Sequence, residues 1–387
     1  MIYLDHNATT PADPRVVKKM LPYFSEKYGN PSSVHSFGQE ARSAIEEARH
    51  HIATLMHCHE KEIIFTSGGT EANNLAIRGT LEATKKKGRH LVTSSIEHHA
   101  VLNVFKRLEK EGYEVTFLPV NSDGRIEIQT LAEALRPDTV LVSVMTANNE
   151  SGVMEPIEEI GFLLHERGIL FHTDAVQAVG KIPLDCSSLP IDLLSASAHK
   201  FGGPKGAGFV YCRKNIRINP QIVGGHHEKG RRAGTENVPC IIGMGKAAEI
   251  AHQEINKEVF RIGALRDKLE EGILKSIPEV RIVSKNVLRL YNTSLVLVKY
   301  VEGEAMLLNL DFEGIEVSSG SACTSGSLEP SHVLLACGYP HEDAHGSIRF
   351  SLGKTNTEEE INTVLEVFPR VVEKLRKMSP FKAQSLT

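Results

Sequence analysis

Three short stretches carry residues whose types and spacing suit a carbonyl cofactor. SASAHKFGGPKG (195–206) places Lys200 between an apolar run and several glycines, and a lysine at the carboxyl edge of a sheet can form a Schiff base. FTSGGTEANN (65–74) joins an apolar run to a Ser/Gly/Thr turn and a helix start, where free N–H groups suit a phosphate. HTDAVQAVG (172–180) places Asp174 just past an apolar run, where a carboxylate can keep a pyridine nitrogen protonated.

Each stretch also has a simpler interpretation. Lys200 fits a solvated surface turn equally well, and the turn around Gly69 and Thr70 is a weak indication by itself. Asp174 taken alone is equally suited to cap a helix N-terminus. The three stretches nevertheless occur in order at successive strand ends of one predicted sheet. A lysine, a phosphate cradle and an aspartate in that arrangement together indicate a site for pyridoxal 5'-phosphate.

Short apolar runs alternate with helical stretches between residues 60 and 215. The apolar runs are EIIF (62–65), HLVTS (90–94), EVTFLP (114–119), TVLVSVM (139–145), GILFHTD (168–174), DLLSAS (192–197) and GFVYCR (208–213). Helical stretches separate them, for example at 71–87, 98–111 and 156–167. Strands that alternate with helices predict an α/β fold with a mainly parallel sheet covered on both faces. Ligands of such sheets bind outside the carboxyl ends of the strands.

The pattern changes after residue 255. The expected elements are a charged helix (255–276), strands near 279–284 and 291–299, a helix near 303–311, strands near 315–319 and 346–352, and a last helix over 357–377. Thr357 and Glu360 stand in capping-box spacing at the start of that helix. We therefore expect a large α/β domain over 15–255 and a smaller α+β domain built from 1–14 and 256–387. The extreme N-terminus is expected to pack on the smaller domain.

Composition argues against several classes of protein. The chain has 387 residues, 41% of them hydrophobic, which is enough for two or three domains. A net charge of −4 and a pI near 6.5 give no reason to expect nucleic acid or an anionic membrane as a partner. No apolar run approaches the ~20 residues of a membrane span, and the N-terminus shows no secretion signal. The six cysteines form no CxxC pair, so we expect a protein of the reduced cytoplasm.

Two stretches contain cysteines in unusual company. HCH at 57–59 would point adjacent side chains apart on a helix, so we expect no metal there. VSSGSACTSG (317–326) places Cys323 among small polar residues, although cysteines are usually buried among apolar ones. Serine, glycine and threonine pack little and allow motion. This composition predicts a reactive thiol that needs a partner.

Over nearly its whole length the chain resembles the NifS/IscS-type cysteine desulfurases, which are pyridoxal phosphate enzymes of aminotransferase fold type I. The motifs that carry the resemblance are YLDHNATTP (3–11), GNPSSVH (29–35), FTSGGTEANN, IEHHAV (96–101), ANNESG (147–152), HTDAVQ, SASAHKFGGPKG, RAGTENVP (232–239), SSGSACTSG and SIRFSLG (347–353). Cys323 in SSGSACTSG separates the desulfurases from other enzymes of this fold type. The stretch from 319 to 331 marks the long-loop class.

The chain departs from the family pattern at three places. Gly69 often aligns with alanine, and Lys354 falls where arginine is common. GGHHEKG (224–230) differs from the usual GGGxERG. These differences leave the expected reaction class unchanged.

The resemblance implies how this chain would hold the cofactor. Lys200 would bear the internal aldimine, and Ser197 and His199 would help to hold the cofactor. Asp174 would pair with the pyridinium nitrogen, and Gln177 would hydrogen-bond the ring hydroxyl.

The resemblance also implies a phosphate site and a proton carrier. Thr70, with the Gly69 backbone, would hold the phosphate. Thr235 would reach the phosphate of a neighbouring subunit, which implies a homodimer. His98 would stack on the ring and transfer protons. The sequence alone does not choose between His98 and His99, whereas the resemblance chooses His98.

The implied reaction is the release of sulfur from L-cysteine. Asn149 and Arg349 would bind the substrate carboxylate, because a guanidinium fork matches a carboxylate. Taken alone, Arg349 also fits a strand-end surface charge. Cys323 would attack the substrate sulfur as a thiolate, leaving alanine and a persulfide. The long-loop class usually hands sulfur to iron–sulfur scaffold proteins of the NifU/IscU type. Cys323 could ligate a cluster transiently with such a scaffold, but no metal is expected within the chain.

Other functions remain open at this level. A selenocysteine lyase would share the sequence features, whereas an ordinary aminotransferase of this fold type would have no use for Cys323. A non-catalytic, sulfur-carrying protein that binds a scaffold would not need the complete Lys–Asp–His–Cys set.

Overall fold

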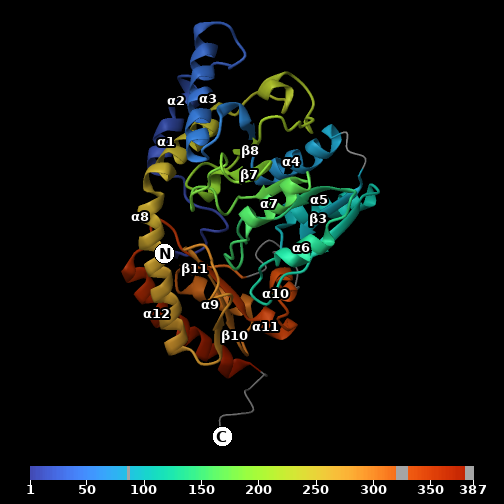
Figure 1. The fold of residues 1–387 in the computed structure, drawn as a ribbon. Coiled ribbons are helices and arrows are strands. Elements are labelled where there is room, and N and C mark those ends of the chain that lie inside the picture. Colours follow the sequence, from blue (N-terminus) through green and yellow to red (C-terminus); the bar gives the residue numbers. More distant parts are fainter. Residues whose placement is uncertain (85–87, 320–329, 380–387) are drawn as a thin grey trace.

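The computed structural model describes residues 1–84, 88–319 and 330–379 (Figure 1). Its strands are β1 Ile2–Tyr3, β2 Ile63–Thr66, β3 His90–Ser94, β4 Glu114–Leu118, β5 Thr139–Ser143, β6 Leu170–Asp174, β7 Leu193–Ser197, β8 Gly208–Cys212, β9 Val280–Ile282, β10 Thr293–Val298, β11 Ile315–Glu316 and β12 Ser347–Ser351. Its α-helices are α1 Pro14–Met20, α2 Pro22–Ser25, α3 Ser36–Leu55, α4 Gly69–Ala83, α5 His99–Lys110, α6 Ile128–Ala134, α7 Ile157–Glu166, α8 Val238–Ser276, α9 Gly303–Phe312, α10 His332–Ala336, α11 His341–His345 and α12 Glu358–Met378.

The largest sheet has seven strands in the order β2-β8-β7-β6-β5-β3-β4. Strands β3 to β7 run parallel to their neighbours within this group, while β8 runs antiparallel to β2 and β7. All seven apolar runs expected between residues 62 and 213 form these strands, so the predicted mainly parallel α/β sheet is confirmed.

Both faces of this sheet are covered, as continuous apolar strands require. Ile64 of β2 belongs to a core cluster with residues of α4 and α5. Its neighbours Ile63 and Phe65 belong to a second cluster with residues of α3, α7 and α8. This alternation follows from the strand period of two, which sends successive side chains to opposite faces.

A second sheet forms the lower part of the molecule in Figure 1. It contains three antiparallel strands in the order β12-β10-β9. Residues of β10 and β12 share a core with α9, α12 and the C-terminal half of α8. Strand β1 pairs in parallel with β11, so the predicted packing of the N-terminus on this part is confirmed. The predicted capping box of Thr357 and Glu360 at the start of α12 is also confirmed.

Helix α8 connects the two parts along one side of the molecule (Figure 1). A helix was expected over 255–276, but α8 begins at Val238, so the expected start is wrong. The Asn237 side chain accepts the Cys240 N–H and a proline follows in the first turn, which together favour a start here. The domain division at 255 therefore falls within a continuous helix. It stays a prediction, which the two separate core clusters support.

None of the described helices combines the length and the apolar character that crossing a membrane requires.

Candidate active site

One cavity of about 310 Å³ is lined by ten of the residues that the sequence analysis singled out. They come from strand ends, helix starts and loops of the upper part and, for Arg349, from β12 of the lower part. They are Gly69, Thr70, His98, Asn149, Asp174, Gln177, Ser197, His199, Lys200 and Arg349. The volume lies at the lower end of the range usual for small-molecule sites. Parallel strands end at a common edge, which explains why residues from successive motifs meet here.

Lys200 lies in a short 3₁₀ helix, Ala198–Lys200, directly after β7. Its Nζ donates to the carbonyl oxygens of Asn7 at 2.6 Å and Ala8 at 2.8 Å. The N-terminal segment therefore holds the lysine amine at the cavity. The simple interpretation of Lys200 as a solvated surface residue is wrong, because the amine is engaged at a cavity wall.

Asp174 is the last residue of β6 and is 5% exposed. Its Oδ2 accepts the side-chain amide of Asn73 at 2.7 Å, and its Oδ1 accepts the Val176 N–H at 2.9 Å. Residues 176–181 form turns rather than an α-helix, so the helix-capping interpretation of Asp174 is wrong. Two donors fix the carboxylate in the cavity wall, where it can face a cationic ring nitrogen.

His98 lines the cavity, and His99 is directed to the ring of His332 at a centroid distance of 4.9 Å. His98 is the N-cap of α5, and its Nδ1 accepts the Ala100 N–H at 3.1 Å. In a neutral ring the proton consequently resides on Nε2. Burial lowers the pKa of His98, Asp174 opposes this shift, and Lys200 and His99 add to it. The ring is therefore mainly neutral at pH 7, and its Nε2 carries the N–H donor.

The turn between β2 and α4 provides the candidate phosphate cradle. α4 begins at Gly69, and its N-cap residue Gly68 supplies no side-chain hydrogen bond to the first turn. The first N–H groups of a helix have no partner within the helix, and the helix dipole favours an anion there. A Cβ at Gly69 would lie 2.8 Å from Val176 Cγ2, so the close packing of this turn requires glycine or a shift of Val176. Thr70 and Ser197 line the cavity beside this turn.

His199 contacts the N-terminal segment. Its Nδ1 lies 3.1 Å from Thr9 Oγ1. Burial, with the charges of Lys200 and Lys205, lowers the pKa of His199 to about 4, so the ring is neutral.

Arg349 enters the cavity from β12 with a side chain that is only 3% exposed. Its Nη1 donates to the Asn149 carbonyl at 2.8 Å and its Nη2 to Asp5 Oδ1 at 2.7 Å. Its Nε is buried and has no hydrogen-bond partner among the described residues. The interpretation of Arg349 as a surface charge is therefore wrong. A fixed guanidinium with an unused donor is suited to an anionic group.

Gln177 is held on both sides of its amide. Its Nε2 donates to the Asn7 carbonyl at 3.0 Å, and its Oε1 accepts the Lys181 amine at 2.8 Å. Asn7 thus accepts both Gln177 and Lys200 on one carbonyl oxygen. The sequence reading singled out neither Asn7 nor Lys181, and it also missed Asn73, the partner of Asp174. An Asn within YLDHNATTP was the only signal available for Asn7.

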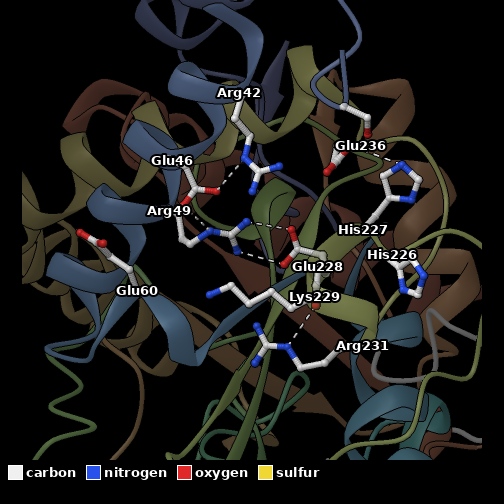
Figure 2. A pocket seen from close by; sticks show the side chains of 11 residues that line it. Arg42, Glu46, Arg49, Glu60, His226, His227, Glu228, Lys229, Arg231 and Glu236 are labelled. Atoms are coloured by element: carbon white, nitrogen blue, oxygen red, sulfur yellow. Dashed lines mark hydrogen bonds and ion pairs between the residues drawn. The ribbon is translucent and has the colours of Figure 1, made fainter. Parts of the chain in front are cut away.

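Thr235 is exposed and does not line this cavity. The next residue, Glu236, lines a different pocket of about 340 Å³ (Figure 2). That pocket contains the segment that departs from the family pattern, including Glu228 and Lys229, whose φ angles of 49° and 58° are left-handed. Figure 2 shows the Glu228 carboxylate facing the Arg49 guanidinium. Two N–H groups of Arg49 donate to the two carboxylate oxygens of Glu228, at 2.8 and 2.9 Å.

Cys323 lies outside the described residues, but the chain on both sides of its segment is described. Ser318 exchanges two backbone hydrogen bonds with Arg349. Ser331 Oγ hydrogen-bonds Oε2 of Glu150, the residue after Asn149. The chain thus leaves residue 319 and returns at residue 330 beside the two residues expected to bind a substrate carboxylate.

The HCH stretch lies at the end of α3, where His57 has a φ of 48°. Among the described residues, no group of three or more His, Cys, Asp or Glu side chains is arranged to hold a metal ion.

Comparison with known proteins identifies the family. Residues 2–364 match the model of the family described as aminotransferase class-V. The chain is 54% identical to "Cysteine desulfurase 2" of Trichormus variabilis, over 98% of this chain and 95% of that protein. It is 53% identical to "Cysteine desulfurase IscS" of Dictyoglomus turgidum, over 99% of this chain and 97% of that protein.

Solved structures match as well. A structure titled "NIFS-LIKE PROTEIN" matches with a TM-score of 0.91 at 39% identity, covering 97% of this chain and 100% of that one. A structure titled "SspA in complex with cysteine" matches with a TM-score of 0.80 at 37% identity, covering 91% and 99%. The chain therefore belongs to the aminotransferase class-V family, and within it to the NifS/IscS-type cysteine desulfurases.

Proposed function

We propose that this cysteine desulfurase uses pyridoxal 5'-phosphate to convert L-cysteine to L-alanine and keeps the sulfur as a persulfide on Cys323. One observation carries the proposal. Lys200, Asp174 and Arg349 line one cavity. Before the Cys323 segment, Ser318 exchanges backbone hydrogen bonds with the cavity residue Arg349. After it, Ser331 hydrogen-bonds Glu150, the chain neighbour of the cavity residue Asn149.

The cavity residues fit this cofactor in their donors and charges. Lys200 would attach the aldehyde through its amine, and Asp174, already oriented by two donors, would keep the ring nitrogen protonated. Gln177 would bond the ring hydroxyl. The uncapped start of α4 at Gly69 and Thr70 would hold the phosphate. When bound, the cofactor supplies an electron sink for the electron pair left at the substrate α-carbon after proton loss.

Two further cavity residues would bind and orient the substrate. Arg349 would take the carboxylate of L-cysteine, with Asn149 beside it. Asp5 and the Asn149 carbonyl hold the guanidinium in place, so little side-chain entropy is lost on binding. His98 would stack on the ring and take part in proton transfer.

Cys323 would then take the sulfur. Its thiolate attacks the substrate Sγ, a sulfur–sulfur bond forms and the substrate Cβ–Sγ bond breaks. The electron pair of the broken bond stays with the three-carbon fragment, which takes up one proton at Cβ and regains one at Cα before it leaves as alanine. A thiol of ordinary pKa, near ~8.5, is only a few per cent thiolate at neutral pH, so the site must favour the thiolate at the moment of attack.

We propose that the protein works as a cytoplasmic homodimer. Thr235 is exposed and outside its own cavity, which suits a residue that completes the phosphate site of a neighbouring copy. The five described cysteines are free thiols, which suits a reducing compartment. The sulfur acceptor would be an iron–sulfur scaffold protein of the NifU/IscU type, which could share a cluster transiently with Cys323.

The decisive experiment combines two variants with L-cysteine. Cys323→Ser should bind the cofactor and remain yellow, because the cavity residues are unchanged, yet form almost no alanine or sulfide. Cys240→Ser, a half-buried cysteine on α8, is the matched control and should keep its turnover. In the unmodified protein, mass spectrometry after brief treatment should find one added sulfur on the peptide with Cys323. A sulfur found instead on another cysteine would overturn the proposal, and preferential use of selenocysteine would redirect it.

A further inference from the structure

Lys181 is a buried lysine that the proposed reaction does not use. It lies in the turns that follow β6, and it is 6% exposed. Its Nζ donates to Gln177 Oε1 at 2.8 Å and to the Asn7 side-chain oxygen, Oδ1, at 3.1 Å. No carboxylate pairs with Lys181 in the part of the chain that the structure describes. Burying a lysine without a counter-charge is unfavourable, so a purely structural role would be better served by an apolar residue.

The charged groups that face Lys181 are themselves basic. The charges of Lys200 and Arg349 act on Lys181, and the charge of Lys181 acts in turn on His6, the third basic side chain nearby. Burial, together with Lys200 and Arg349, places the pKa of Lys181 well below its ordinary value. The amine nevertheless keeps at least two hydrogens, charged or neutral, which is the number that its two oxygen partners require.

The contacts of Lys181 determine which way the Gln177 amide points. Lys181 donates to Oε1, and the Asn7 carbonyl accepts from Nε2. A flipped amide would place Oε1 against the Asn7 carbonyl oxygen and lose both hydrogen bonds. Asn7 is fixed in turn, because its Oδ1 also accepts Asn292 Nδ2 at 3.1 Å and its Nδ2 donates to Thr293 Oγ1 at 2.8 Å.

We propose that Lys181 is a positioning residue that locks the Gln177 amide with its nitrogen available to the ring hydroxyl oxygen of the cofactor. The inference rests on the proposed function and deepens it. Nε2 carries two hydrogens, of which the Asn7 carbonyl takes one. The second hydrogen would form the hydrogen bond to the ring oxygen. Without Lys181 the amide can turn and offer its oxygen, which repels a negatively charged ring oxygen.

This orientation has a spectroscopic consequence. A donor on the ring oxygen stabilises the form of the bound cofactor in which that oxygen carries most negative charge, which is the deprotonated form. Loss of the donor should therefore raise the pH midpoint of the cofactor's absorbance change. One ordinary hydrogen bond corresponds to a shift of about half a unit to one unit.

The test is a double-mutant cycle on the cofactor-loaded protein, read by absorbance against pH. Lys181→Met and Gln177→Leu should each raise the midpoint by a similar amount. The double variant should show no larger shift, because Lys181 acts only through Gln177. A pure charge effect of Lys181 would instead persist in the Gln177→Leu background, and such additive shifts would overturn the proposal. Lys181→Arg keeps the donors and should shift the midpoint by less than half as much.

The outcomes separate this inference from the proposed function. If Gln177→Leu moves the midpoint and Lys181→Met does not, the role of Lys181 is refuted and that of Gln177 stands. If Gln177→Leu leaves the midpoint unchanged, the role of Gln177 is refuted together with this inference, while alanine formation still tests the desulfurase activity. Cofactor content and thermal unfolding show whether Lys181→Met folds. If it does not, Lys181→Arg decides, because a full-sized shift in that variant would refute the proposal.

Discussion

Asn73 of α4 donates its side-chain amide to Oδ2 of Asp174 at the end of β6, over 2.7 Å. The two residues are 101 positions apart and both line the cavity. The helix that opens with the candidate phosphate cradle therefore also orients the carboxylate expected to face the ring nitrogen. One helix sets the distance between both ends of the cofactor site.

Asn73→Ala should weaken cofactor binding, because Asp174 would lose a hydrogen bond to a charged acceptor. Such a bond is worth roughly 1.5–3 kcal/mol, which corresponds to a rise in Kd of about tenfold or more. Titration of the apoprotein with pyridoxal 5'-phosphate, followed by absorbance, measures this. The control is Asn74→Ala, since among the described residues the Asn74 side chain bonds only the Thr70 carbonyl in its own helix. Equal affinities for the two variants would show that Asn73 does not support Asp174.

Lys200→Ala should abolish turnover and the absorbance band of the covalently attached cofactor. The cofactor should still bind through its phosphate, since the start of α4 is unchanged. Spectroscopy and an alanine assay measure the two effects. Lys205→Ala, five residues further along the chain, is the matched lysine control. Normal turnover in Lys200→Ala would rule out the assignment.

Arg349→Ala should raise the KM for L-cysteine about tenfold or more, because a charge-assisted contact worth roughly 1.5–3 kcal/mol is lost. Arg349→Lys should recover only part of the affinity, since an ammonium lacks the planar fork. Arg370→Ala, on the exposed face of α12, serves as the control. Steady-state kinetics with all three variants checks the prediction, and an unchanged KM in Arg349→Ala would contradict it.

Glu228→Gln should destabilise the fold strongly. The Arg49 and Glu228 side chains are 9% and 3% exposed, and removing one member of a buried pair costs about 3–5 kcal/mol. Glu46 also pairs with Arg49, but its side chain is 47% exposed. Glu46→Gln should therefore cost less than about 1 kcal/mol. Urea unfolding compares the two variants. Similar losses of unfolding free energy in both variants would show that burial does not determine how much the Arg49–Glu228 pair contributes to stability.

Glu150→Gln should stabilise the protein at alkaline pH. Burial raises the pKa of Glu150 to about 7, although Ser331 and Arg349 act in the opposite direction. Because the folded-state pKa lies above the ordinary value near 4.5, the folded state binds the proton more tightly. Stability is therefore full below about pH 4.5 and falls until about pH 7.

The total loss for Glu150 is on the order of 3 kcal/mol, at about 1.4 kcal/mol for each pKa unit. Glutamine cannot ionise, so unfolding of Glu150→Gln should depend less on pH in this window. Glu158→Gln, on the exposed side of α7, is the matched substitution. Denaturant unfolding at pH 5, 6, 7 and 8 measures the difference, and parallel curves for the two variants would refute the prediction.

The sequence by itself determined the large sheet and most residues of its edge. Each of the seven strands is a short apolar run bounded by polar residues, and such a run needs cover on both faces wherever it packs. The residues at the ends of β2, β6 and β7 then follow directly in the chain, so the positions of Thr70, Asp174 and Lys200 at one edge could be predicted. The helix start at Val238 could not, because residues 241–245 of α8 are all buried, so this part of the helix shows no one-sided apolar period.

Only the tertiary structure decided which side chains hold these residues in place. Asn7 contacts Ser351, 344 positions away, and Lys200, 193 positions away. Arg349, in the middle of β12, is buried against Asp5 and the Asn149 carbonyl, although the sequence alone fits a surface charge at a strand end equally well. Contacts over such separations leave no periodic pattern in the chain, because they depend on how the N-terminal segment, β12 and the β6 turn meet. The chemistry-bearing residues were therefore readable from local sequence, and the residues that orient them were not.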